Sequence, residues 1–259
     1  GVGVVDKIGE GVENVKVGDR VGYVMGPPGA YSECRIYPAD RLIKIPDYIS
    51  DSQAAAILLK GLTVSYLINK TFRVKKGQTV LFHAAAGGVG LIACQWLSNI
   101  GVQVIGTVSS EDKVEIAKAH GCHHTINYSH EDFTKKVEDI TSGKGVPVVF
   151  DGVGADTFEG SLKCLSTFGV LVSFGASSGK PPQLSLSELA AKALYITRPS
   201  LAPHTATPAL TKQISSPLFR AIKDGLKISI SQKFLLKDAA NAHRALERRK
   251  TTGSTILEI

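Results

Sequence analysis

The stretch Thr79-Val-Leu-Phe-His-Ala-Ala-Ala-Gly-Gly-Val-Gly90 continues directly into Leu91-Ile-Ala-Cys-Gln-Trp-Leu97. An apolar run of strand formers meets a cluster of very small residues, and apolar positions then recur at helical spacing. A strand, a tight turn and a helix in this order can hold a nucleotide diphosphate, because glycines admit the pyrophosphate and the helix start presents free N–H groups. Ala85 stands where the usual G-x-G-x-x-G motif has its first glycine. The incomplete motif alone therefore leaves a cofactor cradle and a merely structural turn equally open.

Strands and helices alternate between Gly77 and Pro199. We expect strands at 79–83, 102–108, 124–127, 146–150, 170–174 and 194–197, and helices at 89–100, 111–120, 132–141 and 156–165. This alternation predicts an α/β fold with a doubly wound parallel sheet, whose ligand site lies beyond the carboxyl ends of the strands. The strand at 194–197 comes last and has no evident cover, so we expect an exposed sheet edge that can pair with a second copy.

The two ends of the chain lack this alternation. Short segments punctuated by glycine and proline predict strands at 3–8, 20–25, 30–36 and 42–45. The closing part predicts a strand at 228–234, a helix at 237–249 and a strand at 255–259. We expect the flanking strands to complete one small β-rich sheet. The chain would then consist of a central domain at 61–202 and a flanking domain formed by 1–60 and 203–259.

Composition is that of an ordinary globular protein, with 43% hydrophobic and 20% charged residues among 259. No apolar stretch approaches the roughly 20 residues that cross a bilayer, and the start lacks a secretory pattern. The four cysteines are scattered without C-x-x-C spacing. They predict buried thiols in a reducing compartment, and hence a cytoplasmic protein.

The net charge of +7 raises the question of an anionic partner. The densest basic cluster is Arg244, Arg248, Arg249 and Lys250. A solvated helix face with cations near its carboxyl end explains this cluster. No aromatic-plus-basic motif favours nucleic acid, which stays a minor alternative.

The seven histidines give no metal-binding pattern. His123 and His124 are adjacent, so in a strand they point to opposite faces. The others have no partner at ligand spacing: His83, His120, His130, His204 and His243. We therefore expect no metal site.

An ordered series of motifs along the chain resembles one known family. The chain is similar to the quinone oxidoreductases, the zeta-crystallin-like branch of the medium-chain dehydrogenase/reductase superfamily. The motifs that carry the resemblance are Gly18-Asp-Arg-Val21, Gly29-Ala-Tyr-Ser-Glu33, Lys60-Gly-Leu-Thr63, Ala84-Ala-Ala-Gly-Gly-Val-Gly90, Asp151-Gly-Val-Gly154, Ser173-Phe-Gly175 and Thr197-Arg-Pro-Ser-Leu201.

This resemblance implies a Rossmann domain joined to a GroES-like catalytic domain, NADPH as cofactor, no zinc, a quinone substrate and a homodimer. The family's GroES-like domain starts before the segment that matches Gly1. The resemblance thus implies a partial GroES-like domain in this sequence, with some substrate-site residues outside it and the activity of the chain as given left open. No catalytic residue is named for this reason.

The cofactor can be inferred from the end of the second predicted strand. An NAD site usually has a carboxylate there, which bonds the ribose 2′-hydroxyl. Here Ser109 ends the strand and Lys113 follows one helical turn later, and these groups suit a 2′-phosphate. By themselves they fit equally well as a helix cap and a solvated lysine. The resemblance implies that Ser109, Lys113 and Tyr128 hold the 2′-phosphate of NADPH.

The resemblance also implies the remaining cofactor contacts. They are the cradle residues Ala86, Gly87, Gly88 and Val89, Thr63 on the nicotinamide side, and Phe174 and Ser177 beside the nicotinamide and its ribose. Without the family resemblance, the simpler interpretation is that Thr63 is part of an ordinary helix start and that Phe174 is a core side chain.

The leading hypothesis is a zinc-independent, NADPH-dependent quinone oxidoreductase. Hydride transfer needs cofactor positioning more than acid–base groups. One alternative is an NADPH-dependent reductase of enones (α,β-unsaturated carbonyls), which turnover with each acceptor separates. Another alternative is a non-catalytic, crystallin-like protein that binds NADPH or AU-rich RNA. If it binds RNA, the affinity for RNA must weaken steeply as the salt concentration rises.

Overall fold

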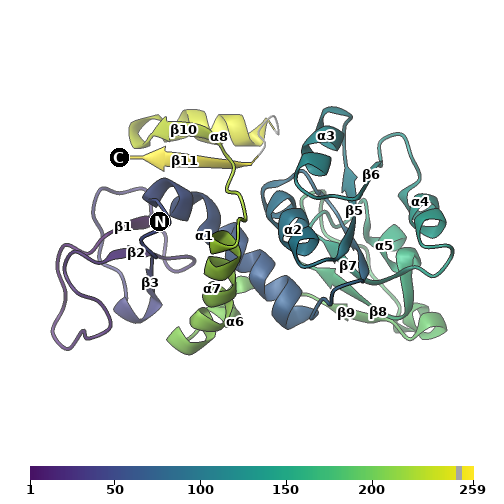
Figure 1. The fold of residues 1–259 in the computed structure, drawn as a ribbon, viewed down its shortest axis with the longest axis horizontal. Coiled ribbons are helices and arrows are strands. Elements are labelled where there is room, and N and C mark those ends of the chain that lie inside the picture. Colours follow the sequence, from purple (N-terminus) through teal and green to yellow (C-terminus); the bar gives the residue numbers. More distant parts are fainter. Residues whose placement is uncertain (249–252) are drawn as a thin grey trace. The chain divides into compact units, whose positions relative to one another are not determined.

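The computed structural model describes residues 1–248 and 253–259, in two compact units (Figure 1). The sheet unit is Leu67–Ser200. The flanking unit combines Gly1–Tyr66 with Leu201–Ile259. The division of the sequence after residues 60 and 202 stays a prediction.

The sheet unit is built on six parallel strands in the order β6-β5-β4-β7-β8-β9. The strands are β4 (Thr79–Phe82), β5 (Gln103–Val108), β6 (His124–Asn127), β7 (Val146–Asp151), β8 (Leu165–Ser173) and β9 (Tyr195–Thr197). The chain runs outward from β4 to β6 and then crosses back to β7, so the strand order reverses between β4 and β7. The predicted doubly wound sheet is confirmed, with β9 at one edge.

Helices cover both faces of this sheet (Figure 1). They are α2 (Gly88–Asn99), α3 (Asp112–Ala119), α4 (Phe133–Ile140) and α5 (Phe158–Cys164), with a π-helical turn η2 (Leu67–Thr71) and a 3-10 segment η3 (Leu186–Lys192). α2 packs against α3, and α4 packs against α5. The sheet core between them is fully buried at Leu81, Ile105, Val149 and Leu171.

The ends of α2 and α4 and the bounds of α5 each have a simple physical cause. Gly101 and Gly143, both at positive φ, follow the ends of α2 and α4, where only glycine adopts this conformation freely. The helix expected at 156–165 is shorter at both ends. It begins at Phe158 and ends at Cys164, because Leu165 already pairs with Val146 in the sheet.

The flanking unit contains two separate small sheets. The antiparallel sheet is β1 (Val2–Val4), β2 (Arg20–Gly22) and β3 (Ile43–Lys44), and the parallel pair is β10 (Ile230–Leu235) and β11 (Ser254–Glu258). The expectation of one shared sheet is therefore wrong. The long helix α1 (Asp51–Tyr66) packs against β1, β2 and β11, so it joins the two sheets through side chains instead of strand pairing.

The helices of the flanking unit complete its core. They are α1, α6 (Leu201–His204), α7 (Pro208–Lys223) and α8 (Ala239–Glu247), with 3-10 turns η1 (Ala39–Arg41) and η4 (Leu236–Asp238). α1 packs against α7, where a Cβ on Gly61 would lie 2.6 Å from the Leu218 side chain. Lys60-Gly-Leu-Thr63 lies inside α1 and not at a helix start.

Several expected strands of the flanking unit are shorter or absent. No strand forms at 30–36, where the chain makes a series of bends and Ile36 is 98% exposed. The segment has no neighbouring strand to pair with among the described residues. The strand expected at 20–25 ends at Gly22, before Met25 and Gly26 turn the chain at positive φ. The strand expected at 3–8 ends at Val4.

The helix expected at 237–249 begins later, at Ala239, after the turn η4. Its described part ends at Glu247, and Arg249 and Lys250 lie outside the described residues. In the described parts of the chain, no helix has the length and apolar character needed to cross a membrane.

Candidate functional site

The turn between β4 and α2 forms a cradle at the carboxyl edge of the sheet. Ala84 adopts positive φ (55°), and the backbone N–H of Ala85 donates to the Thr107 carbonyl at 2.9 Å. Gly87 is the N-cap of α2, and its N–H donates to the Ala84 carbonyl at 2.9 Å. The first N–H groups of α2 have no partner within the helix, so they and the positive end of its dipole can receive an anion.

The small residues of the cradle are required by close backbone packing. A Cβ on Gly90 would lie 2.3 Å from the Ala84 carbonyl oxygen, so only glycine lets α2 approach β4 so closely. Ala85 replaces the first glycine of the usual motif, and its side chain is fully buried. Space for that methyl comes from Gly106 on β5, because a Cβ there would lie 2.6 Å from the Ala85 Cβ. The departure from the motif is thus accommodated by the neighbouring strand.

A hydroxyl and an ammonium group meet where β5 ends. Lys113 Nζ donates to Ser109 Oγ at 3.2 Å. The N-cap position of α3 is Glu111, so the alternative role of Ser109 as that cap is excluded. Within residues 1–248 and 253–259, Lys113 makes no ion pair with a carboxylate.

Nearby acidic groups are engaged elsewhere. The Ser110 hydroxyl bonds the Asp112 carboxylate and lowers the pKa of that side chain. Glu111 Oε2 accepts from Asn127 Nδ2 at 3.4 Å. Tyr128 follows β6 and is half-buried, with its N–H donating to the Val108 carbonyl at 3.1 Å. The Ser109–Lys113 pair therefore offers positive charge and a donor at this corner of the sheet.

The loop after β8 brings two further predicted residues to the same edge. The N–H of Phe174 donates to the Asp151 carbonyl at 2.8 Å, and its ring lies 5.7 Å from that of Phe82. Ser177 is exposed, and its N–H donates to the Gly152 carbonyl at 3.2 Å. In the sheet unit, every predicted site residue thus follows the carboxyl end of β4, β5, β6 or β8.

Arg198 was not predicted as a site residue, although it belongs to the motif 197–201. Its Nη1 donates to Ser173 Oγ at 2.8 Å and to the Gly175 carbonyl at 2.6 Å. A side chain from the end of β9 therefore fixes the loop that carries Phe174.

Asp151 organises the turn after β7 and was also missed as a site residue. Its Oδ1 accepts from the N–H groups of Val153 and Gly154 at 2.8 and 3.0 Å. Its Oδ2 accepts from the hydroxyls of Thr157 and Ser161 at 2.8 and 3.0 Å. The carboxylate is only 1% exposed, so four donors compensate for its burial.

His83 extends this network under the cradle. Its Nδ1 lies 2.8 Å from Thr107 Oγ1, and its Nε2 lies 2.9 Å from Ser161 Oγ. Complete burial lowers the pKa of His83 to about 4, against an upward pull from Asp151. The imidazole is neutral at physiological pH and links β4, β5 and α5.

Thr63 lies in the flanking unit, where its Oγ1 donates to the Leu59 carbonyl at 2.8 Å. Its predicted contact with the nicotinamide stays a prediction. Among the described residues, no group of three or more His, Cys, Asp or Glu side chains could hold a metal ion.

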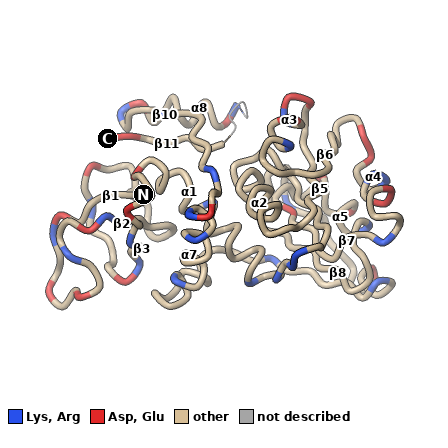
Figure 2. The backbone as a smooth tube through the Cα atoms, viewed as in Figure 1, with Lys and Arg blue, Asp and Glu red and all other residues tan. Residues whose placement is uncertain are grey.

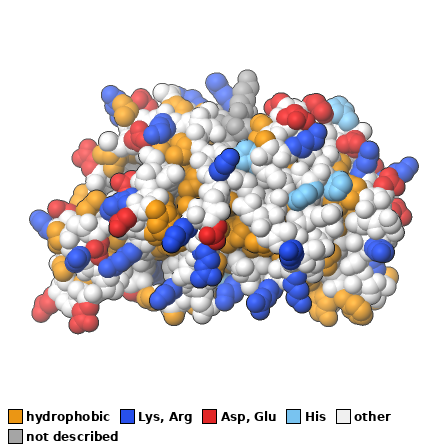
Figure 3. Space-filling model, in the orientation of Figure 1, with side chains coloured by type: hydrophobic (Ala, Val, Ile, Leu, Met, Phe, Trp, Pro, Cys, Tyr) orange, Lys and Arg blue, Asp and Glu red, His pale blue; other side chains and the backbone are white. Residues whose placement is uncertain are grey.

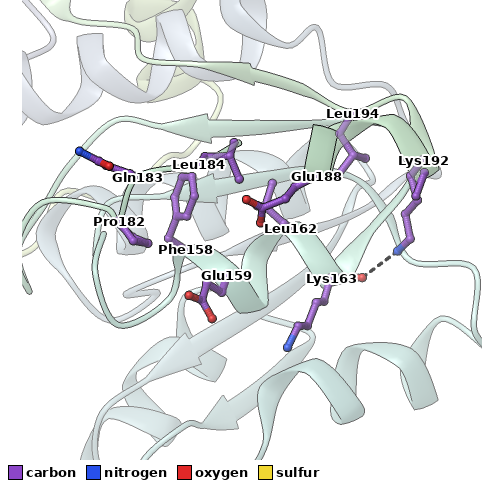
Figure 4. Close-up of a pocket in the computed structure, with 11 residues that line it drawn as sticks. Phe158, Glu159, Leu162, Lys163, Pro182, Gln183, Leu184, Glu188, Lys192 and Leu194 are labelled. Carbon is purple, nitrogen blue, oxygen red and sulfur yellow. Dashed lines mark hydrogen bonds between the residues drawn. The ribbon is translucent and has the colours of Figure 1, made fainter. Parts of the chain in front are cut away.

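A cavity of about 460 Å³ lies away from the cradle in the sheet unit. Side chains of α5, the loop at 182–184 and η3 surround it (Figure 4). None of the predicted site residues lines it. Charged residues of both signs are interspersed along the backbone (Figure 2), and one face shows their side chains mixed with apolar groups (Figure 3).

The sheet unit with its glycine cradle is a dinucleotide-binding fold of the dehydrogenase type. A sequence model described as zinc-binding dehydrogenase matches residues 88–216. A quinone oxidoreductase of Pseudomonas aeruginosa is 49% identical over 259 residues, covering 99% of this chain and 80% of that protein. A 2-haloacrylate reductase of a Burkholderia species is 44% identical, covering 98% of this chain and 78% of that protein.

Solved structures agree with these sequence matches. The Escherichia coli quinone oxidoreductase complexed with NADPH has a TM-score of 0.95 and 46% identity, over 100% of this chain and 80% of that one. The chain belongs to the quinone oxidoreductases of the medium-chain dehydrogenase/reductase family. It spans about four fifths of the length of these relatives.

Proposed function

We propose that this protein is an NADPH-dependent quinone oxidoreductase that works without zinc. The observation that carries the proposal is the Ser109–Lys113 pair at the end of β5, next to the tight β4–α2 turn, where a Cβ on Gly90 would lie 2.3 Å from the Ala84 carbonyl oxygen. A carboxylate at this corner would repel a 2′-phosphate, whereas a hydroxyl and an ammonium attract one. The proteins it resembles at 46–49% identity include a quinone oxidoreductase solved with NADPH.

The chain's own residues would bind and orient the cofactor. The free N–H groups of Gly88 and Val89 at the start of α2 suit the pyrophosphate, with Ala86 and Gly87 leaving room for it. Tyr128 would contact the adenosine end, and Phe174 and Ser177 would contact the nicotinamide end. The contact of Thr63 with the nicotinamide is a prediction from the family resemblance. When bound, NADPH supplies the hydride. The protein's contribution is orientation and exclusion of water.

Binding of the two dinucleotides tests this proposal directly. Trp96 lies on α2 and is only 6% exposed, so its fluorescence reports on the helix that begins at the cradle. We expect titration with NADPH to saturate at a concentration at least tenfold lower than NADH, the difference expected for one charge-assisted phosphate contact. Equal affinity, or no binding of either dinucleotide, would overturn the proposal.

Reduction of α,β-unsaturated carbonyls is the second candidate, because a 2-haloacrylate reductase is 44% identical to this chain. The same cradle would serve both acceptors. Oxidation of NADPH with a quinone and with an enone, measured side by side on one preparation, separates the two activities. We expect faster turnover with the quinone.

We also propose a cytoplasmic homodimer. β9 lies at the sheet edge, and its Tyr195 is 60% exposed. Open strand edges favour pairing with another copy across a two-fold axis. Three of the four cysteines are buried free thiols, which suits a reducing compartment.

A further inference from the structure

An acidic residue lies in the turn that carries the proposed phosphate corner (Ser109 and Lys113). Glu111 comes two residues after Ser109 and is exposed. A carboxylate near the end of the second strand is typical of NAD sites, because it bonds the ribose 2′-hydroxyl and repels a 2′-phosphate. A site that prefers NADPH therefore has to hold this carboxylate away from the phosphate corner.

The turn after β6 contacts the turn after β5 at two points. Asn127 is the last residue of β6 and is 4% exposed, and its Nδ2 donates to Glu111 Oε2 at 3.4 Å. Ser129 Oγ donates to the Ser109 carbonyl at 2.9 Å. Side chains that follow β6 thus fix both the backbone of the phosphate corner and the acidic group next to it.

The orientation of the Asn127 amide is set by its own turn. Its Oδ1 accepts from the Ser129 N–H at 3.2 Å, and its backbone N–H donates to Glu131 Oε2 at 3.1 Å. The residue pairs with Val108 at the end of β5. Because the carbonyl side of the amide is used within the turn, its NH₂ side faces Glu111.

The Asn127 amide therefore controls where the Glu111 charge lies. Within residues 1–248 and 253–259, Glu111 makes no ion pair that would hold its carboxylate elsewhere. Without the amide, the carboxylate is released beside the phosphate corner. There it would repel a 2′-phosphate and could accept a hydrogen bond from the 2′-hydroxyl of NADH.

We propose that Asn127 is a specificity-determining residue, whose amide holds the Glu111 carboxylate away from the phosphate corner and so favours NADPH over NADH. This inference rests on the proposed function, because it concerns the same cofactor site. Asn127 acts through Glu111, so it is a positioning residue and not a ligand of the cofactor. The Ser129 hydroxyl assists by tying the turn after β5 to β6.

Asn127→Ser tests the proposal. A serine hydroxyl can still accept from the Ser129 N–H, as hydroxyls do in such turns, but it has no amide to hold Glu111. The measured quantity is the Kd for NADH divided by the Kd for NADPH, from calorimetric titration with each dinucleotide. We expect this ratio to fall about fivefold, the size expected for repulsion between two charges about 4 Å apart in water. A fall of less than about twofold would overturn the proposal.

The matched control is Asn99→Ser. Asn99 is exposed at the carboxyl end of α2, the end opposite the cradle. We expect both Kd values to stay at those of the wild type.

Glu111→Gln separates the effect of charge from that of packing. In the double variant Asn127→Ser/Glu111→Gln the ratio should return to within about twofold of the wild type, because glutamine carries no charge. A loss that persists in the double variant would mean that Asn127 supports the corner only by packing, and would overturn the proposal.

The single variant Glu111→Gln decides the question even if Asn127→Ser does not fold, because position 111 is exposed. Its ratio should stay within about twofold of the wild type, since the charge it removes is already held away from the corner. A larger rise in the preference for NADPH would show a carboxylate that Asn127 does not restrain, and would overturn the proposal.

The wild-type titrations distinguish this inference from the proposed function. A wild-type protein that binds NADPH no more tightly than NADH contradicts the proposed function. A wild-type protein that prefers NADPH, with a ratio that Asn127→Ser leaves unchanged, contradicts the role of Asn127 alone.

Discussion

We expect the charge at the end of β5 to decide the preference between NADPH and NADH. Lys113 Nζ is held by Ser109 Oγ at 3.2 Å, and the acidic neighbours Glu111 and Asp112 are bonded to other groups. The ammonium is therefore available to a ligand. A 2′-phosphate distinguishes NADPH from NADH, so this lysine should affect only one of the two dinucleotides.

Lys113→Ala should raise the Kd for NADPH by about 10- to 100-fold, the usual effect of losing a charge-assisted hydrogen bond. The Kd for NADH should stay the same. Lys118→Ala is the matched control, because Lys118 lies on the same helix and pairs with Glu115 at 2.9 Å. Calorimetric titration of both dinucleotides measures the effect. Equal losses for NADPH and NADH would place Lys113 away from the 2′-phosphate.

Asp151→Asn should destabilise the protein by about 1–3 kcal/mol, because an amide leaves buried donors without their acceptor. The carboxylate accepts four hydrogen bonds, whereas an asparagine has one acceptor oxygen and adds two donors. Urea unfolding measures this loss. Asp156→Asn, at an exposed position of the same loop, is the control and should leave the unfolding midpoint unchanged.

Single residues show where sequence reasoning works and where it fails. Ser109 and Lys113 could be proposed because they follow a strand at a fixed distance from the glycines. Asp151, Ser161 and His83 meet only after β4, β7 and α5 have packed, so their spacing in the sequence carries no sign of the network. Gly106 likewise explains Ala85 only once β4 and β5 lie side by side.

Among the elements, α2 depends most on one close contact. Gly90→Ala should lower the free energy of unfolding by about 1–3 kcal/mol, because the new Cβ would overpack against backbone atoms that cannot rotate away. NADPH binding should weaken as well, since the shift falls at the start of the helix. Gly9→Ala is a suitable control, because its Cβ would meet its nearest atom at 4.0 Å. Unfolding curves and NADPH titration would show the effect, and wild-type values for both would contradict it.

The strand β9 gives the next prediction. If two copies pair through this edge, Tyr195→Lys should convert the dimer to a monomer, since a charged side chain on an open edge blocks strand pairing. Tyr195 is 60% exposed, so the substitution should leave the fold intact. Sedimentation velocity measures the change, with the exposed position Val17→Lys as control. A monomeric wild-type protein, or a dimeric Tyr195→Lys variant, would reject this interface.

Most elements of the sheet unit agree closely with the expected bounds, because the apolar periodicity and the glycine positions point to the same boundaries there. The exception is β8, which begins at Leu165, whereas the strand was expected from residue 170. Continuous apolar runs marked the strands, and Gly101 and Gly143 marked helix ends. In the flanking unit the signals are weaker. The segment 30–36 has strand-like composition but no partner strand in the part of the chain that the structure describes. The flanking strands pair within two sheets, which both contact α1. Strand pairing over long sequence distances leaves little trace in a single sequence.

For the whole molecule, family membership and fold follow from one ordered series of motifs, whereas overall charge is uninformative. The net charge of +7 comes from Lys and Arg dispersed among acidic residues (Figure 2). The cavity lined by Phe158, Leu184 and their neighbours is likewise no guide to the cofactor (Figure 4). The candidate site lies instead at the carboxyl ends of the parallel strands, and its hydrogen-bond donors are what identify it.

Stability of the whole molecule should depend on the buried imidazole under the cradle. The pKa of His83 is about 4 in the folded protein, against an ordinary value of 6.5. Between these values the unfolded chain binds a proton that the folded protein does not, so stability falls as the pH is lowered from 6.5 to about 4. The loss from this group should approach about 3 kcal/mol at the lower end of this range.

Urea unfolding at pH 7, 5.5 and 4.5 measures this dependence. His83→Gln removes the titrating group and should flatten the profile in this range, although the variant is less stable at pH 7 because Thr107 and Ser161 lose their partner. His124→Gln, at an exposed histidine, should keep the wild-type slope. Carboxylates whose pKa is lowered in the folded protein, such as those of Asp132 and Glu131, change the stability mainly below their ordinary pKa values of 3.8 and 4.5. The change in stability at higher pH within this range therefore comes from His83. A wild-type profile that is flat from pH 6.5 to 4.5 would mean that the folded protein admits a proton at His83.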